Sequence, residues 1–231
     1  MRPPKHKVVK NPESREIIYS DEQWRLLKKL RGIAEDIMSR LRNCRIDSVT
    51  YGSVARGDVD HKSDVDVFIP YTIQPYLLET CLQREGVAPS SRYIVKATPS
   101  MTPKGYIELD IEGKATLSFP LDNLSLREWE FYKFGGLVTY DELVNGVRRP
   151  GVNKNLILIL PTEKGHKEFP VIGYENYVAK VIGISIETVK ERVKVLSRRD
   201  EHGRTGVFLT YILHPEESFE EALDKLNLRK I

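Results

Sequence analysis

Tyr51-Gly52-Ser53-Val54-Ala55-Arg56-Gly57, followed shortly by Ser63-Asp64-Val65-Asp66-Val67-Phe68-Ile69, is the stretch of sequence that decides the fold. The first part is a turn of small residues before a short predicted helix, where Gly52 lets the backbone approach an anion closely. Ser53 adds a hydroxyl and an N–H group at the positive end of that helix. The second part alternates, with Asp64 and Asp66 on one face of a predicted strand and aliphatic side chains on the other.

Two carboxylates that project side by side repel each other unless a hard divalent cation lies between them. Mg²⁺ suits the pair because it accepts a few carboxylates and leaves room for phosphate oxygens and water. Either part alone is a weak signal, since Gly-Ser turns are common and an Asp-x-Asp segment can be a solvated strand edge. The order and spacing of the two parts together predict a nucleotide–metal site.

At these residues the sequence resembles the superfamily of DNA-polymerase-β-like nucleotidyltransferases, whose signature is Gly-Ser, a short loop and Asp-x-Asp. The Ala55-Arg56-Gly57 segment is similar to the minimal nucleotidyltransferases of archaea and bacteria, and the resemblance covers residues 45–115. It implies an α/β (α+β) domain whose mixed sheet is flanked by helices. It also implies that Asp64 and Asp66 hold two Mg²⁺ ions, with Mn²⁺ as a substitute. The triphosphate of the nucleotide would be bound by Gly52, Ser53 and Arg56.

A third carboxylate is expected on the predicted strand from Gly105 to Glu112, because the cation next to the attacking hydroxyl needs a further oxygen ligand. Glu108, Asp110 and Glu112 share one face of that strand. Asp110 best matches the third aspartate of the superfamily and is expected to be catalytic and metal-binding. Glu108 is the alternative, and a solvated acidic strand face is the other interpretation.

The composition is that of a globular protein. The chain has 231 residues, of which 40% are hydrophobic and 30% charged, and this balance excludes the class of disordered tail proteins. The net charge of +3 is too small to indicate nucleic-acid binding by itself. Cys44 and Cys81 have no metal-binding spacing, and we expect two reduced thiols in the cytoplasm rather than a disulfide. No apolar run is long enough for a membrane span, and no secretion signal is apparent.

Two parts of the chain are expected. Residues 1–122 would form the nucleotidyltransferase domain, with a basic N-terminal arm and a long helix that begins at a capping box from Ser20 to Gln23. Apolar residues recur at helical spacing along that helix, at Trp24, Leu27, Leu30, Ala34, Ile37, Met38 and Leu41. Residues 123–231 would form a smaller C-terminal domain, with the boundary between Asp122 and Asn145.

The C-terminal part contains a second informative segment, residues 174–214. The run from Gly183 to Val189 resembles the helix-turn-helix of bacterial and archaeal transcription regulators. A Gly-Arg-Thr-Gly turn and a predicted strand from Val207 to Leu213 follow, as in a winged helix. The candidate nucleic-acid-binding residues are Lys190, Arg192, Lys194, Arg198, Arg199 and Arg204. Winged helices also serve as protein-docking modules, so nucleic acid is one of two possible partners.

The resemblance implies an enzyme that transfers a nucleoside monophosphate from a nucleoside triphosphate, with ATP the expected nucleotide, and releases pyrophosphate. The acceptor is left open between a nucleic-acid end, a small molecule and a protein hydroxyl. The alternatives are a DNA-binding regulator that uses the fold as a sensor, and an antitoxin-like protein that adenylylates a partner. The sequence identifies neither the nucleotide base nor the acceptor, because contacts to these groups follow no short motif.

Overall fold

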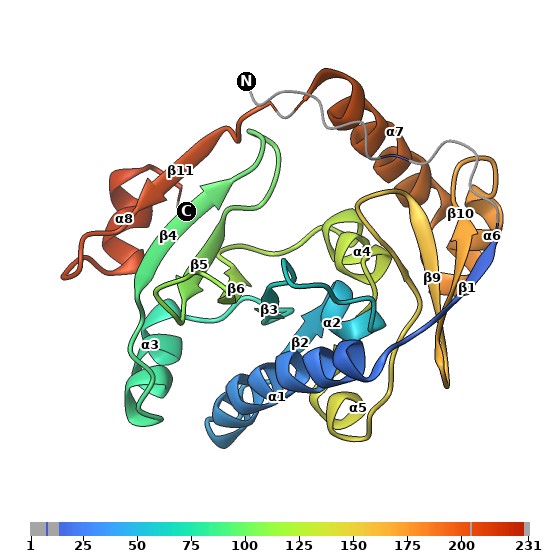
Figure 1. Cartoon of the computed structure of the whole chain (residues 1–231). Helices are drawn as coiled ribbons and strands as arrows, with labels where there is room; N and C mark the ends of the chain where they lie inside the picture. The colour runs from blue at the N-terminus through green and yellow to red at the C-terminus, as the bar shows by residue number, and fades with distance from the viewer. Residues whose placement is uncertain (1–7, 9–13, 204, 229–231) are drawn as a thin grey trace.

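The computed structural model describes Val8 and residues 14–203 and 205–228 (Figure 1). The strands are β1 (Arg15–Ile18), β2 (Val49–Tyr51), β3 (Val65–Phe68), β4 (Ser91–Lys96), β5 (Lys104–Glu108), β6 (Ala115–Pro120), β7 (Leu137–Thr139), β8 (Gly151–Val152), β9 (Ile157–Thr162), β10 (Gly165–Pro170) and β11 (Leu209–Ile212). The helices are α1 (Asp21–Asn43), α2 (Ser53–Arg56), α3 (Pro75–Arg84), α4 (Leu126–Phe134), α5 (Tyr140–Val144), α6 (Glu175–Ile182), α7 (Ile186–His202) and α8 (Phe219–Lys225).

In the described residues, the strands form two sheets. The larger has the order β11-β4-β5-β6-β3-β2-β7, and the smaller has the order β1-β10-β9-β8. β3 and β6 pair in parallel, whereas the neighbouring pairs of the larger sheet are antiparallel. The predicted mixed sheet flanked by helices is therefore confirmed.

Helix α1 covers one face of the larger sheet, as its sequence pattern predicted. The side chain of Ser20 caps the helix by accepting a hydrogen bond from the N–H group of Gln23. The buried side chains of α1 are Leu27, Leu30, Ala34, Ile37, Met38 and Leu41. They lie in one core with the odd-numbered residues of β3, such as Val65 and Val67. This packing leaves the even-numbered residues of β3 to face away from α1.

The two halves of the sequence are interleaved in the fold. Strands β7 and β11, which come from beyond residue 122, complete the two edges of the larger sheet. Strand β1, from the N-terminal half, is the edge of the smaller sheet and pairs with β10. The predicted boundary at residue 122 therefore does not separate one sheet from the other.

The predicted wing does not form. Strand β11 pairs antiparallel with β4 of the larger sheet, with Leu209 opposite Lys96, instead of forming a hairpin beside α6 and α7 (Figure 1). The edge of β4 offers backbone N–H and C=O groups that β11 satisfies, and sequence alone does not reveal such an edge. Helices α6 and α7 and their turn at Gly183 do form at the predicted residues. Arg204, the predicted wing arginine, lies outside the described residues.

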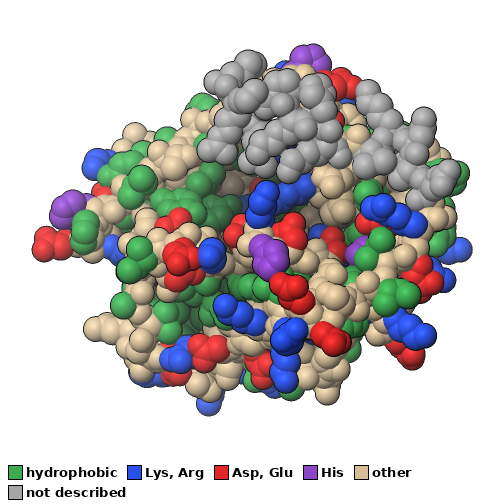
Figure 2. All heavy atoms as spheres, in the orientation of Figure 1, with side chains coloured by type: hydrophobic (Ala, Val, Ile, Leu, Met, Phe, Trp, Pro, Cys, Tyr) green, Lys and Arg blue, Asp and Glu red, His purple; other side chains and the backbone are tan. Residues whose placement is uncertain are grey.

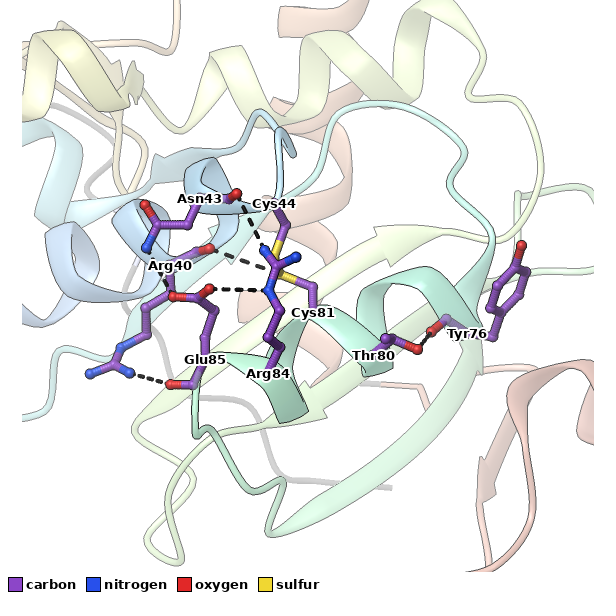
Figure 3. The surroundings of a disulfide bond; sticks show 8 residues. All are labelled: Arg40, Asn43, Cys44, Tyr76, Thr80, Cys81, Arg84 and Glu85. Carbon is purple, nitrogen blue, oxygen red and sulfur yellow. Dashed lines mark hydrogen bonds and ion pairs between the residues drawn. A yellow bond between two sulfur atoms is a disulfide. The ribbon is translucent and has the colours of Figure 1, made fainter.

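The expectation of two reduced cysteines is wrong, because Cys44 and Cys81 form a disulfide (Figure 3). Cys44 caps the C-terminus of α1, and Cys81 lies on α3, which packs against α1. Helix packing thus brings together two residues that are 37 positions apart in the sequence. Arg84 donates to the sulfur of Cys44 and pairs with Glu85 beside it. In the part of the chain that the structure describes, none of the helices has the length and apolar character of a membrane span.

Candidate functional site

A cavity of about 550 Å³ lies where the two halves of the chain meet. Ser53, Asp64 and Asp66 line it from the side of α2 and β3. Arg192 and other residues of α7 line it from the opposite side. Figure 2 shows acidic and basic side chains next to one another near the centre of this face of the molecule. A volume of this size is typical of a site for a small molecule.

The predicted phosphate turn forms at the start of α2. Gly52 has φ +78° and ψ −145°, a backbone conformation that favours glycine, and its N–H group donates to the carbonyl of Gly136. Helix α2 is as short as predicted, and it ends at Gly57 in the left-handed conformation. The hydroxyl of Ser53 donates to the hydroxyl of Ser63 at 3.2 Å. The two serines therefore place hydroxyl groups at the cavity edge, next to the acidic strand.

The two predicted metal ligands lie together in this cavity. Asp64 immediately precedes β3, and Asp66 is within it. Burial raises the pKa of Asp66 to about 6, and the negative charge of Asp64 adds to the rise. A divalent cation would relieve this repulsion, so the two carboxylates fit Mg²⁺ chemically. In residues 14–203 and 205–228, the structure contains no group of three or more His, Cys, Asp or Glu side chains that could hold a metal.

The structure does not bring Asp110 into the same cavity. Strand β5 ends at Glu108, so Asp110 lies in the turn that leads to β6, not on the strand as predicted. Its carboxylate accepts hydrogen bonds from the backbone N–H groups of Lys114 and Ala115. It lines a second cavity of about 820 Å³ against α1, on the other side of the sheet. Its proposed metal-binding role therefore remains a prediction without geometric support.

Glu108, the alternative third carboxylate, shares a sheet face with Asp66. Thr116 on β6 pairs with Asp66 on one side and with Glu108 on the other. Paired residues of neighbouring strands project to the same face, so the three side chains form a row across the sheet. The sequence did not predict this row through Thr116, because the register between strands cannot be read from a single sequence.

Arg56 has a structural environment that the sequence did not reveal. Its guanidinium is buried and forms two hydrogen bonds to the carboxylate of Asp58, at 2.9 and 3.0 Å. A third hydrogen bond reaches the carbonyl of Gly135, at the end of α4. The side chain lines the cavity, and these partners use three of its five N–H donors. The predicted contact with the triphosphate would have to use the two remaining N–H donors of Arg56.

The predicted basic row of α7 is divided between two faces. Arg192 and Arg199 line the cavity, whereas Lys190, Lys194 and Arg198 are exposed at intervals of four residues. The guanidinium of Arg192 lies over the ring of Phe131, at 4.6 Å from its centroid. Burial, together with the charge of Arg199, lowers the pKa of Arg192 to about 10. Arg192 is thus part of the same site as the two aspartates.

The N-terminus of α7 is packed against α4. Glu130, a buried residue of α4, accepts hydrogen bonds from the N–H and hydroxyl groups of Ser185 and from the hydroxyl of Thr188. Burial alone would raise the pKa of Glu130, but these hydrogen bonds lower it below its ordinary value. In helix-turn-helix proteins the N-terminal residues of the second helix contact the bases. In this fold, Ser185 and Thr188 at that end of the helix are bound to α4, whereas Glu187 is exposed.

Lys154 is a site residue that the sequence analysis missed. It lies in the turn between β8 and β9, lines the cavity, and lowers the pKa of Asp66 by its charge. The turn is held by the side chain of Asn153, which accepts from the N–H groups of Asn155 and Ile157. In the sequence, Asn-Lys-Asn between two apolar segments is typical of any polar turn. Its position opposite β3 follows only from the fold.

Comparison with known proteins agrees with the first part of this site. No curated protein and no solved structure matches the chain. One family model is similar to part of the chain, residues 28–139. This region contains Ser53, Asp64 and Asp66 and ends at β7, so α6 and α7 lie outside it. Residues 28–139 are similar to the family described as the nucleotidyltransferase domain, which supports the superfamily that the Gly-Ser and Asp-x-Asp residues predicted.

Proposed function

We propose that this protein transfers a nucleoside monophosphate from a nucleoside triphosphate to a hydroxyl acceptor. The observation that carries the proposal is the placement of Asp64 and Asp66 beside Ser53 in one cavity, within a region similar to a nucleotidyltransferase domain. The acceptor oxygen bonds to the α-phosphorus, and the bond from that phosphorus to the oxygen shared with the β-phosphate breaks. Pyrophosphate leaves, and the hydroxyl proton passes to solvent.

Asp64 and Asp66 would hold Mg²⁺, or Mn²⁺ in its place. The bound metal would stabilise the charge that develops on the attacking and leaving oxygens. Two protein carboxylates suffice for Mg²⁺, because it commonly keeps several water ligands and binds substrate phosphates. We retain Glu108 and Asp110 as candidates for a further carboxylate; neither lines the cavity, and Glu108 shares a sheet face with Asp66.

The phosphates would enter at the start of α2. Ser53 supplies a hydroxyl there, and Ser63 lies within hydrogen-bond distance of it. Gly52 has no side chain to obstruct an anion, and only glycine adopts its backbone conformation easily. Two repelling carboxylates in one cavity serve no purpose in a scaffold, which favours the enzyme over a sensor that has lost catalysis. We propose ATP as the first nucleotide to test; the acceptor is a nucleic-acid end, a small molecule or a protein hydroxyl.

The test is an incubation of the protein with Mg²⁺ and each α-labelled nucleoside triphosphate, against total nucleic acid and total protein. We expect label to appear on one acceptor class. Asp64→Asn and Asp66→Asn should each lower the rate about 100-fold or more, because metal stabilisation of the transferred phosphate supplies several kcal/mol. Glu112→Gln removes an exposed carboxylate near the same sheet edge and should leave the rate unchanged.

Two companion variants, Glu108→Gln and Asp110→Asn, identify which carboxylate acts as a third ligand. A loss of transfer activity in Glu108→Gln alone would agree with the row of side chains that Glu108 forms with Thr116 and Asp66. The proposal is contradicted if Mg²⁺ with nucleotide raises the melting temperature of wild type and of Asp64→Asn equally, because the ligand would then bind elsewhere.

A further inference from the structure

Arg192 is a partly buried cation, and no hydrogen bond or ion pair with another described residue satisfies its guanidinium. Its Nε atom is inaccessible to solvent and has no hydrogen-bond acceptor among the described residues. Among these residues, it also forms no ion pair with a carboxylate. A buried, unsatisfied charged donor is costly, and such a group usually has a ligand that satisfies it. Because Arg192 lines the cavity, that ligand would be an anion within it.

The side chain of Arg192 is held in a fixed position before any ligand binds. Its guanidinium lies over Phe131 and, at 6.0 Å from the ring centroid, near Phe134 at the end of α4. Such cation–π contacts fix the plane of the group and reduce the entropy lost when a ligand binds. Helix α7 is in turn attached to α4 through Glu130. The cation is therefore presented by a rigid part of the fold.

Lys154 and Arg199 add positive charge to the same cavity. Lys154 lines the same cavity as Asp64 and Asp66. The cavity thus has a pair of aspartates that suits a metal and a group of basic side chains, with Asp200 among them, that suits an anion. A nucleoside triphosphate with its metal carries both charges, and guanidinium groups bind phosphate oxygens through two parallel hydrogen bonds.

We propose that Arg192 and Lys154 bind the outer phosphates of the nucleoside triphosphate, so that the nucleotide is held between α2 and α7. This inference rests on the proposed function for the identity of the ligand. It gives α7 a role in the nucleotide site, although α7 lies outside the region that is similar to a nucleotidyltransferase domain. A cavity of about 550 Å³ suits a ligand of nucleotide size.

The test measures the binding of inorganic tripolyphosphate by calorimetry, with EDTA present so that no metal contributes. We expect Arg192→Gln to weaken binding about 10- to 100-fold, as for the loss of a charged hydrogen-bonding group. Arg192→Lys should be intermediate, since it keeps the charge but loses the planar arrangement of donors. Lys190→Gln, on the exposed face of the same helix, is the matched control and should bind like wild type.

Lys154→Gln keeps the experiment informative if the Arg192 variants fold poorly, because Lys154 is exposed on a turn. It should also weaken tripolyphosphate binding, by a smaller factor. Wild-type affinity, within twofold, for both Arg192→Gln and Lys154→Gln would overturn the inference. In the transfer assay, Arg192→Gln should raise the KM for the nucleoside triphosphate more than it lowers kcat.

The two proposals fail in different ways. Metal-free tripolyphosphate binding that depends on Arg192, in a protein without transferase activity, supports the anion site and rejects the proposed reaction. Transferase activity with an unchanged KM in Arg192→Gln supports the reaction and rejects the role of Arg192.

Discussion

Strand β3 and helix α7 line one cavity with different charged residues: β3 contributes the carboxylate of Asp66, and α7 contributes Arg192, Arg199 and Asp200. The charges of β3 follow from a local pattern, because alternation along a strand is enough to put Asp64 and Asp66 on one face. The charges of α7 depend on what the helix packs against. Arg192 belongs to the site only because α7 packs against α4. The comparison teaches that a strand motif identifies its own surface, whereas a basic helix does not identify its ligand.

The largest expected effect concerns Arg56, on the β3 side of the cavity. Arg56→Met removes one partner of the buried ion pair with Asp58, so we expect unfolding to require about 3–5 kcal/mol less free energy. Urea denaturation followed by circular dichroism measures this change. Arg42→Met, which breaks the exposed ion pair with Asp141, should cost less than about 1 kcal/mol.

Binding measurements on the same variant sharpen the assignment. If the Arg56 side chain is structural, triphosphate and monophosphate affinities should fall together in Arg56→Met. Wild-type stability combined with a selective loss of triphosphate affinity would instead restore the nucleotide-binding role that the sequence suggested.

The core of the N-terminal part was predictable from sequence for a physical reason. Its signals are local: the alternation in β3, the apolar stripe of α1 and the glycine before α2 act within a few residues. The family match over residues 28–139 agrees with them. The mixed sheet was therefore predicted correctly, and in the structure Ser53, Asp64 and Asp66 line one cavity.

Apart from Asp110, the incorrect and missing predictions depend on long-range contacts. The disulfide requires α3 to pack on α1, and the pairing of β11 requires the open edge of β4. Asp110 was placed on a strand because its neighbours alternate, but the chain turns at that point to form β6. Lys154 belongs to the site only because the turn that carries it folds towards β3. The turn at Asp110 closes within five residues, whereas the other contacts leave no pattern in neighbouring residues.

The next effect in size concerns Glu130, on the α7 side. Glu130→Ala leaves the buried donors of Ser185 and Thr188 without an acceptor, and we expect a loss of about 2–3 kcal/mol of stability at pH 7. Because the folded state lowers the pKa of Glu130, its contribution is present above pH 4.5 and is lost as the pH falls through the lowered pKa. Urea denaturation at several pH values should show the two proteins converging in acid.

A control removes a charge at the same helix end without the buried contacts. Glu191→Ala breaks only the exposed pair with Arg127 and should change stability by less than about 1 kcal/mol. A difference between Glu130→Ala and wild type that does not depend on pH would contradict the role of the carboxylate charge. The loss would then reflect packing alone.

The smallest effect is expected on the exposed face of α7, where Lys190, Lys194 and Arg198 are changed together to Gln. These side chains point away from the cavity, so tripolyphosphate affinity should stay within about twofold, and stability within about 0.5 kcal/mol. If nucleic acid binds this face, its affinity should fall, and each lost phosphate contact should reduce the log–log salt slope by about 0.9. Titrations of labelled duplex and single-stranded DNA and RNA at several salt concentrations measure that slope.

A triple variant that loses affinity for tripolyphosphate as severely as Arg192→Gln would show that the overall positive charge of α7, and not the position of Arg192, attracts the anion. In that case the two faces of the helix would be equivalent, and the division drawn between them would be wrong.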